Sequence, residues 1–199
     1  MNKLMKLGDC DVQLIGGQIM SRVTVDAKKG DEILRDIKVI IPKAIRADGS
    51  INVEDLAVES LKTEPDQKKM VKAGDIVMKL STPYDAAIVD DDCEGALVPS
   101  FCAIVRGGCD IDRHYLLAFL NSEYCKEQLK NQVAGAAVTV LSVGKIASIY
   151  IPVPTREVQF SIGNTFIESM EKLKLIRQIE VLESKKNNIV FRDLVKEYE

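Results

Sequence analysis

The sequence predicts an α+β fold, with a mixed, mostly antiparallel twisted sheet, helices late in the sheet domain, and one long protruding helix at the C-terminus. Three observations support this prediction. Short β-like runs dominate up to about Pro154, no helix of ten to fifteen residues separates successive runs, and a long apolar stripe at helical spacing follows them. The expected organisation is a domain over residues 1–154 and a helix over residues 155–199.

The expected strands end at turn-forming residues. DIKVIIPKAI is typical of a strand that stops at Pro42, and AGDIVMKLST is typical of a strand that is entered through Gly74 and stops before Pro83. GALVPSFCAIVRGG is rich in small and β-branched residues and predicts one or two more strands. Because helices do not alternate with these runs, we do not expect a doubly wound parallel sheet.

The first helical stretch is DIDRHYLLAFLNSEYCKEQLKNQV. Its apolar residues recur at steps of three and four, Asp112 can cap its start, and Asn121-Ser122 predicts a break into two helices. A short helical turn capped by Ser142 is expected next. An extended YIPVP segment should follow, since a residue that precedes proline avoids the α region.

After Pro154 the pattern becomes that of one long helix. A helix from Glu157 to Leu194 would be about 57 Å long at roughly 1.5 Å per residue, which is longer than the domain is wide. We therefore expect it to protrude, and its apolar stripe then needs a second helix from this chain or another. The alternative is that the helix folds back on its own sheet. The stripe consists of Ile162, Phe166, Met170, Leu173, Ile176, Ile179 and Leu182.

The bulk properties are those of a folded protein. The 199 residues are 46% hydrophobic and 29% charged, and no window approaches the roughly 20 apolar residues that span a bilayer. The N-terminal stretch lacks the pattern of a secretory signal, so we expect a cytoplasmic protein without membrane contact. The five cysteines are scattered, with no C-x-x-C pair, and we interpret them as free thiols.

Motifs for catalysis are absent from the sequence. STPYD lacks the second proline of the Asp/Asn/Ser-Pro-Pro-aromatic signature of methyltransferases that act on DNA bases, and no acidic-x-Lys nuclease element follows Pro65-Asp66. A metal site of Cys93, Cys102 and Cys109 with His114 is an alternative, but metal ligands usually come as close pairs. We expect no catalytic residue, no metal and no cofactor, and we interpret His114 as a capping or surface residue.

Charge is distributed unevenly along the chain. The net charge of −3 does not favour nucleic-acid binding, but the segment from Lys62 to Lys79 carries five lysines against three acidic residues and is locally basic. In contrast, VDDDCEG would be repelled by a phosphate backbone. We expect that acidic segment to face away from any DNA.

Three segments in order carry a resemblance to a known family. VKAGDIVMKLS, then YLLAFLNSE, then GAAVTVLSVGKIASIYIPVPTREVQFSIG before a long helix resemble the DNA-specificity subunits of type I restriction-modification systems. The last segment is the most specific, because it combines a Gly-small-apolar stretch, a Leu-Ser turn, an Ile-Pro-x-Pro strand end and a Glu-x-Gln helix start. These are Gly135, Leu141-Ser142, Ile151-Pro152-Val153-Pro154 and Glu157-Val158-Gln159, with Val158 where an acidic residue is usual.

The resemblance implies a target recognition domain that reads a short half-site in double-stranded DNA. It also implies a helix that spaces recognition domains and docks DNA methyltransferase subunits, and it leaves open a restriction or translocase subunit. Family members usually hold two domains and two helices that pair antiparallel, whereas this sequence has one of each and looks like a half-subunit.

We therefore expect a homodimer through Ile162 to Leu182 and a palindromic bipartite target. The alternative is a helical dimerisation or scaffold protein without DNA selectivity.

Candidate DNA contacts fall into two classes, because phosphate contacts position a protein and base contacts specify the sequence. We expect phosphate contacts from Lys68, Lys69, Lys72 and Lys79, with Lys28, Lys29 and Arg46 as a weaker set. For base reading the candidates are Thr82 and Tyr84. The alternatives are solvated surface lysines and a structural turn at Pro83. Four neutralised phosphates would give a salt slope of roughly −3.6, at about −0.9 each.

Overall fold

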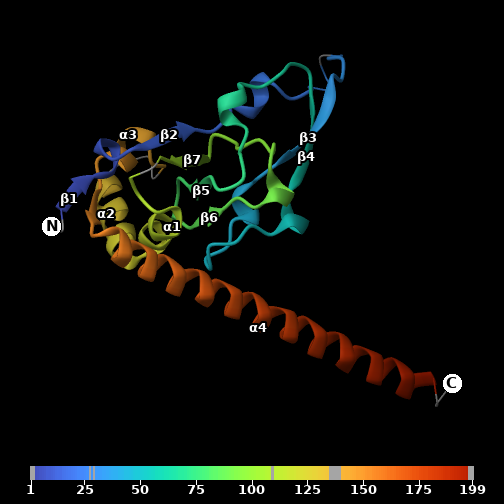
Figure 1. Ribbon diagram of the computed structural model, residues 1–199. Coiled ribbons are helices and arrows are strands. Elements are labelled where there is room, and N and C mark those ends of the chain that lie inside the picture. The colour runs from blue at the N-terminus through green and yellow to red at the C-terminus, as the bar shows by residue number, and fades with distance from the viewer. Residues whose placement is uncertain (1–2, 27, 29, 109, 135–139, 197–199) are drawn as a thin grey trace.

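The computed structural model describes residues 3–26, 28, 30–108, 110–134 and 140–196. Residues 3–153, called here the globular part, hold the described strands and the three shorter α-helices, and helix α4 leaves from one side as a rod (Figure 1). The strands are β1 (Lys3–Lys6), β2 (Val12–Gly16), β3 (Arg35–Val39), β4 (Ala57–Leu61), β5 (Ile76–Lys79), β6 (Ala86–Ile88), β7 (Cys102–Gly107) and β8 (Tyr150–Val153), and the helices are α1 (Arg113–Asn121), α2 (Glu123–Val133), α3 (Val143–Ala147) and α4 (Arg156–Lys196).

The main sheet has the strand order β2-β7-β5-β6, and its neighbouring strands are antiparallel. Two further antiparallel pairs, β1 with β8 and β3 with β4, flank it. Together with the late helices and the long α4, this confirms the predicted fold class. Parallel pairing occurs only as isolated bridges among the described residues, between Gln18 and Pro99 and between Val39 and Leu97.

Both faces of the main sheet are buried, because alternate residues of β5 and β7 enter different cores. Ile76 and Met78 of β5 pack with α1, α2 and α3, whereas Val77 between them packs on the opposite face with Ile40 and Ile45. This is the two-residue period of a strand with apolar side chains on both sides. The sheet therefore supports α1, α2 and α3 on one of its faces.

The late helices begin and end where the sequence predicts. Asp112 accepts hydrogen bonds from the backbone N–H groups of His114 and Tyr115 at the start of α1. Ser122 ends α1 and caps α2, and Ser142 caps α3. Each cap satisfies backbone donors that have no partner within the helix.

The N-terminal strands were not predicted. Strand β1 pairs with β8 in the register Lys3 to Val153 through Lys6 to Tyr150, so the first and last strands of the globular part lie side by side. The α4 helix begins three residues after this pair. No helix among the described residues is long and apolar enough to cross a membrane.

Candidate functional site

The start of α4 is fixed to α1 by a buried glutamine. Gln159 accepts a hydrogen bond from the Asp112 backbone N–H at 2.9 Å and donates one to the Pro154 carbonyl at 3.0 Å. The Tyr115 hydroxyl donates to the Pro152 carbonyl at 2.5 Å. Because buried polar groups need partners, these bonds define one orientation for the joint between β8 and α4.

Gly163 allows α4 to lie directly against the first turn of α1. A Cβ at this position would stand 2.8 Å from the Tyr115 backbone nitrogen and 2.9 Å from the His114 Cβ. Any side chain here would push the two helices apart. The direction in which α4 leaves the globular part therefore depends on this close approach.

A second set of contacts holds α4 to the globular part, about four turns from the start of the helix. Phe166 and Met170 are half-buried over the turn at Gly49, and Arg177 forms an ion pair with Asp48, whose side chain is almost fully buried. Burial alone would raise the pKa of Asp48, but hydrogen bonds from Ser50 and from Arg177 outweigh it and hold that pKa below its usual range. The carboxylate is therefore a charged anchor for the helix.

Replacing Arg177 with glutamine should lower the free energy of unfolding by about 1–2 kcal/mol at pH 7, because Asp48 stays buried with fewer partners. An Asp with a lowered folded-state pKa stabilises the fold above its unfolded pKa, and this contribution disappears as the pH falls through the folded value. The difference between wild type and Arg177→Gln should therefore shrink below about pH 4. Urea unfolding at pH 7 and below about pH 4 measures the free energy of unfolding of both proteins. An equal difference between them at the two pH values would contradict the role of the charged pair.

The apolar stripe of α4 divides into a covered and an exposed part. Phe166 and Met170, which the sequence analysis assigned to pairing with a second helix, pack in part against the globular part. Their own chain already covers much of them. Beyond this contact α4 extends away from the globular part (Figure 1), and its apolar side chains are exposed. The exposed members of the predicted stripe are Ile162, Leu173, Ile176, Ile179 and Leu182.

The predicted phosphate contacts lie in several places. Lys68 and Lys69 belong to the 3-10 turn Gln67–Lys69, where Lys68 is exposed and Lys69 donates to the Gly17 carbonyl at 3.3 Å. Lys72 follows and lines a cleft described below. The structure thus brings part of the basic segment, Lys68 to Lys72, to one edge of the main sheet.

Two sequence-based expectations are wrong for this fold. Lys79 lies at the opposite end of β5, only 15% exposed, and its Nζ is 2.9 Å from the buried Asp85 carboxylate, which Lys126 also contacts. Tyr84 is 1% exposed and belongs to the core against α1. Neither side chain can reach DNA, because one is held in a buried ion pair and the other in apolar packing.

Three of the remaining candidates, Thr82, Arg46 and Lys28, lie among the described residues. Thr82 is exposed. Arg46 lines a groove beside α4, together with Asp90 and Asp92 of the acidic segment. Lys28 is exposed in the loop before β3, and Lys29 lies outside the described residues, as does Gly135 of the family-like motif.

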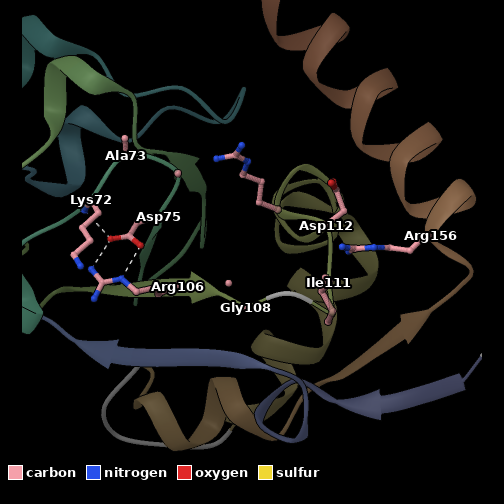
Figure 2. A pocket seen from close by; sticks show the side chains of 11 residues that line it. Lys72, Ala73, Asp75, Arg106, Gly108, Ile111, Asp112 and Arg156 are labelled. Carbon is pink, nitrogen blue, oxygen red and sulfur yellow. Dashed lines mark hydrogen bonds and ion pairs between the residues drawn. The ribbon is translucent and has the colours of Figure 1, made fainter.

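A cleft of about 430 Å³ brings Lys72 together with three arginines that the sequence analysis did not single out. Lys72 and Arg106 line one side and Arg156 lines the other, beside Asp112 (Figure 2). Arg113 also lines this cleft. The three arginines come from the end of β7 and the first residues of α1 and α4, so no local sequence pattern could have grouped them.

The described cysteines are free thiols, as predicted for Cys10, Cys93, Cys102 and Cys125. Cys109 lies outside the described residues. Burial is the main cause that raises the pKa of Cys93, Cys102 and Cys125 to about 12, so these thiols stay protonated at neutral pH. In the described part of the chain, no three His, Cys, Asp or Glu side chains gather as a metal site.

Comparison with known proteins gives matches in shape but not in sequence. Neither a family model nor a curated protein matches the chain. The HsdS subunit from Thermoanaerobacter tengcongensis matches 95% of this chain and 47% of its own, with a TM-score of 0.63 and 17% identity. A second solved structure concerns complex assembly and conformational transition of the type I R-M system. It also matches 95% of this chain and 47% of its own, with a TM-score of 0.66 and 17% identity.

A third solved structure extends the agreement. The S subunit of a type I restriction-modification system from M. genitalium matches 89% of this chain and 41% of its own, with a TM-score of 0.53 and 13% identity. This chain has the fold of a type I specificity subunit. It spans about half the length of the solved chains it matches. The specificity-subunit fold agrees with the resemblance that the motifs around Leu141-Ser142, Ile151–Pro154 and Glu157–Gln159 carry.

Proposed function

We propose that this chain is a non-catalytic DNA sequence-recognition subunit of a type I restriction-modification complex. The observation that carries the proposal is the specificity-subunit fold over 95% of the chain, including the long helix. In this role the globular part reads a DNA half-site and α4 sets the distance between recognition domains and docks methyltransferase subunits. Thr82 and the Lys68–Lys72 edge remain the proposed contacts from the sequence.

The proposed assembly is a homodimer through α4. The support is physical, because an apolar helix face that the globular part leaves open is unfavourable in water until another surface covers it. A second copy supplies a helix of identical length and pattern, and a two-fold contact between copies is self-complementary. Such a dimer presents two identical globular parts, so its DNA target would be palindromic and bipartite.

Co-expression of the chain with a DNA methyltransferase subunit of a type I system, chosen from any that is encoded beside it, tests this function. We expect DNA methylation confined to one bipartite palindromic sequence when both proteins are present, and no such preference with the methyltransferase alone. Sequencing that detects methylated bases in random-sequence plasmid DNA measures this.

The same sequence preference without the chain would contradict the proposed function. A dimeric chain that leaves methylation unselective would instead support a scaffold protein.

A further inference from the structure

We propose that the cleft between β7, α1 and α4 binds one phosphate group of the DNA backbone. The proposal rests on the proposed function for the identity of the ligand as DNA, and on the cleft itself for the phosphate. Lys72, Arg106, Arg113 and Arg156 line this cleft, against only Asp75 and Asp112 among its acidic residues. Guanidinium groups can bind the oxygens of a phosphate bidentately, and DNA presents phosphates along its whole backbone.

The two acidic residues of the cleft are already engaged. Asp75 accepts both Nε and Nη2 of Arg106, at 2.8 and 2.6 Å, and also the backbone N–H of Lys72 (Figure 2). Asp112 accepts two backbone N–H groups at the start of α1. Asp75 and Arg106 neutralise each other. Of the other charged side chains that line the cleft, Lys72, Arg113 and Arg156 stand against Asp112, which leaves a surplus of two positive charges within the lining.

The arginines at the two helix starts are in an unfavourable place without an anion. Arg113 is the first residue of α1 and Arg156 the first of α4, where the helix dipole is positive and disfavours a cation. Among the described residues, no ion pair involves Lys72, Arg113 or Arg156. A phosphate would offset the repulsion that the two arginines experience at both helix starts.

The backbone around the cleft allows a ligand to approach it closely. Gly74, Gly107 and Gly108 line it without side chains. A Cβ at Gly74, where φ is +87°, would stand 2.7 Å from an Arg113 guanidinium nitrogen, so this arginine packs directly on the glycine. Two further acidic residues lie close by without lining the cleft. Asp11 lies beside Gly108 in the fold, and Glu157 follows Arg156 in the sequence. The joint that aims α4 would thus also contact DNA.

The test is the salt dependence of duplex binding by the full chain in complex with its methyltransferase. The probe is a random-sequence DNA duplex, followed by fluorescence anisotropy between about 50 and 200 mM salt. For Arg113→Gln with Arg156→Gln, we expect roughly tenfold weaker binding and a log–log salt slope reduced by about 0.9, the share of one phosphate. Arg113→Lys with Arg156→Lys keeps both charges and should retain most of the wild-type slope.

A matched pair of variants controls for net charge. Arg22→Gln with Lys130→Gln removes the same two positive charges from exposed positions outside the cleft and should leave the slope unchanged. An equal loss in this control, or a wild-type slope in the cleft variant, would overturn the proposal. ATP and inorganic phosphate are tested in parallel by thermal unfolding. Stabilisation by either that requires Arg113 and Arg156, with duplex binding unchanged, would assign the cleft to a free phosphate compound and also overturn it.

The two proposals can fail separately. Sequence-selective methylation with a cleft variant of unchanged slope would keep the proposed function and remove the cleft as a phosphate site. Unselective methylation with a reduced slope in the cleft variant would keep the cleft as a phosphate site and remove the proposed function.

Discussion

Replacing Ile179 and Leu182 with glutamate should convert a dimeric chain into a monomer. These side chains are 60% and 63% exposed on α4, although Leu182 also lines the groove between α4 and Arg46 of the globular part. In a two-fold dimer each substitution occurs twice, so four buried side chains are lost at about 1.5 kcal/mol each. That corresponds to a more than thousandfold weaker association. Sedimentation equilibrium at tens of micromolar protein measures it.

The control for this experiment adds the same charge elsewhere on the helix. Asn187→Glu with Asn188→Glu introduces two carboxylates at exposed polar positions of α4 and should leave association within a few fold of wild type. Circular dichroism checks that α4 remains helical in both variants. A wild-type chain that sediments as a monomer throughout this concentration range would refute pairing between copies, whatever the variants do.

Replacing Tyr84 with alanine should destabilise the protein by about 3–5 kcal/mol, the range for removing a large buried aromatic side chain. The ring is 1% exposed and packs in the core shared with Leu116 and Leu120 of α1. This loss is a large share of the roughly 5–15 kcal/mol that stabilises a typical domain. Urea unfolding of the purified chain measures the difference in free energy.

Tyr124 provides the matched control, because it is a tyrosine that is 49% exposed and contacts only the edge of Phe119 in the ring pairs of the described residues. Tyr124→Ala should cost about 1 kcal/mol or less. If Tyr84→Ala kept wild-type stability but lost DNA selectivity, the sequence-based role of Tyr84 in base reading would be restored.

The features that the sequence predicts well are local ones. The caps at Asp112, Ser122 and Ser142 and the length of α4 follow from residues three or four positions apart, because a helix brings such positions together whatever surrounds it. The strands β5 and β7 were likewise visible as apolar runs between turn residues. Strands β1 and β2 carry a weaker pattern, and their pairing with β8 and β7 joins residues about a hundred or more positions apart.

The candidate phosphate site could not be predicted, because its residues are brought together only by the packing of three elements. Arg106, Arg113 and Arg156 each look like an ordinary charged residue in the sequence, and Lys79 looked equally suitable for DNA until its pairing with Asp85 was visible. Spacing along the chain does not determine which cations are paired with a buried carboxylate and which stay available to a ligand.

By itself the sequence determined the kinds of elements, their order and the long apolar helix, since hydrophobic period and turn chemistry act over a few residues. The tertiary structure decided where α4 points and how much of its stripe stays open. Gln159, Gly163 and the Asp48–Arg177 pair fix that direction. These contacts depend on close approach between distant segments, which only the packed chain specifies.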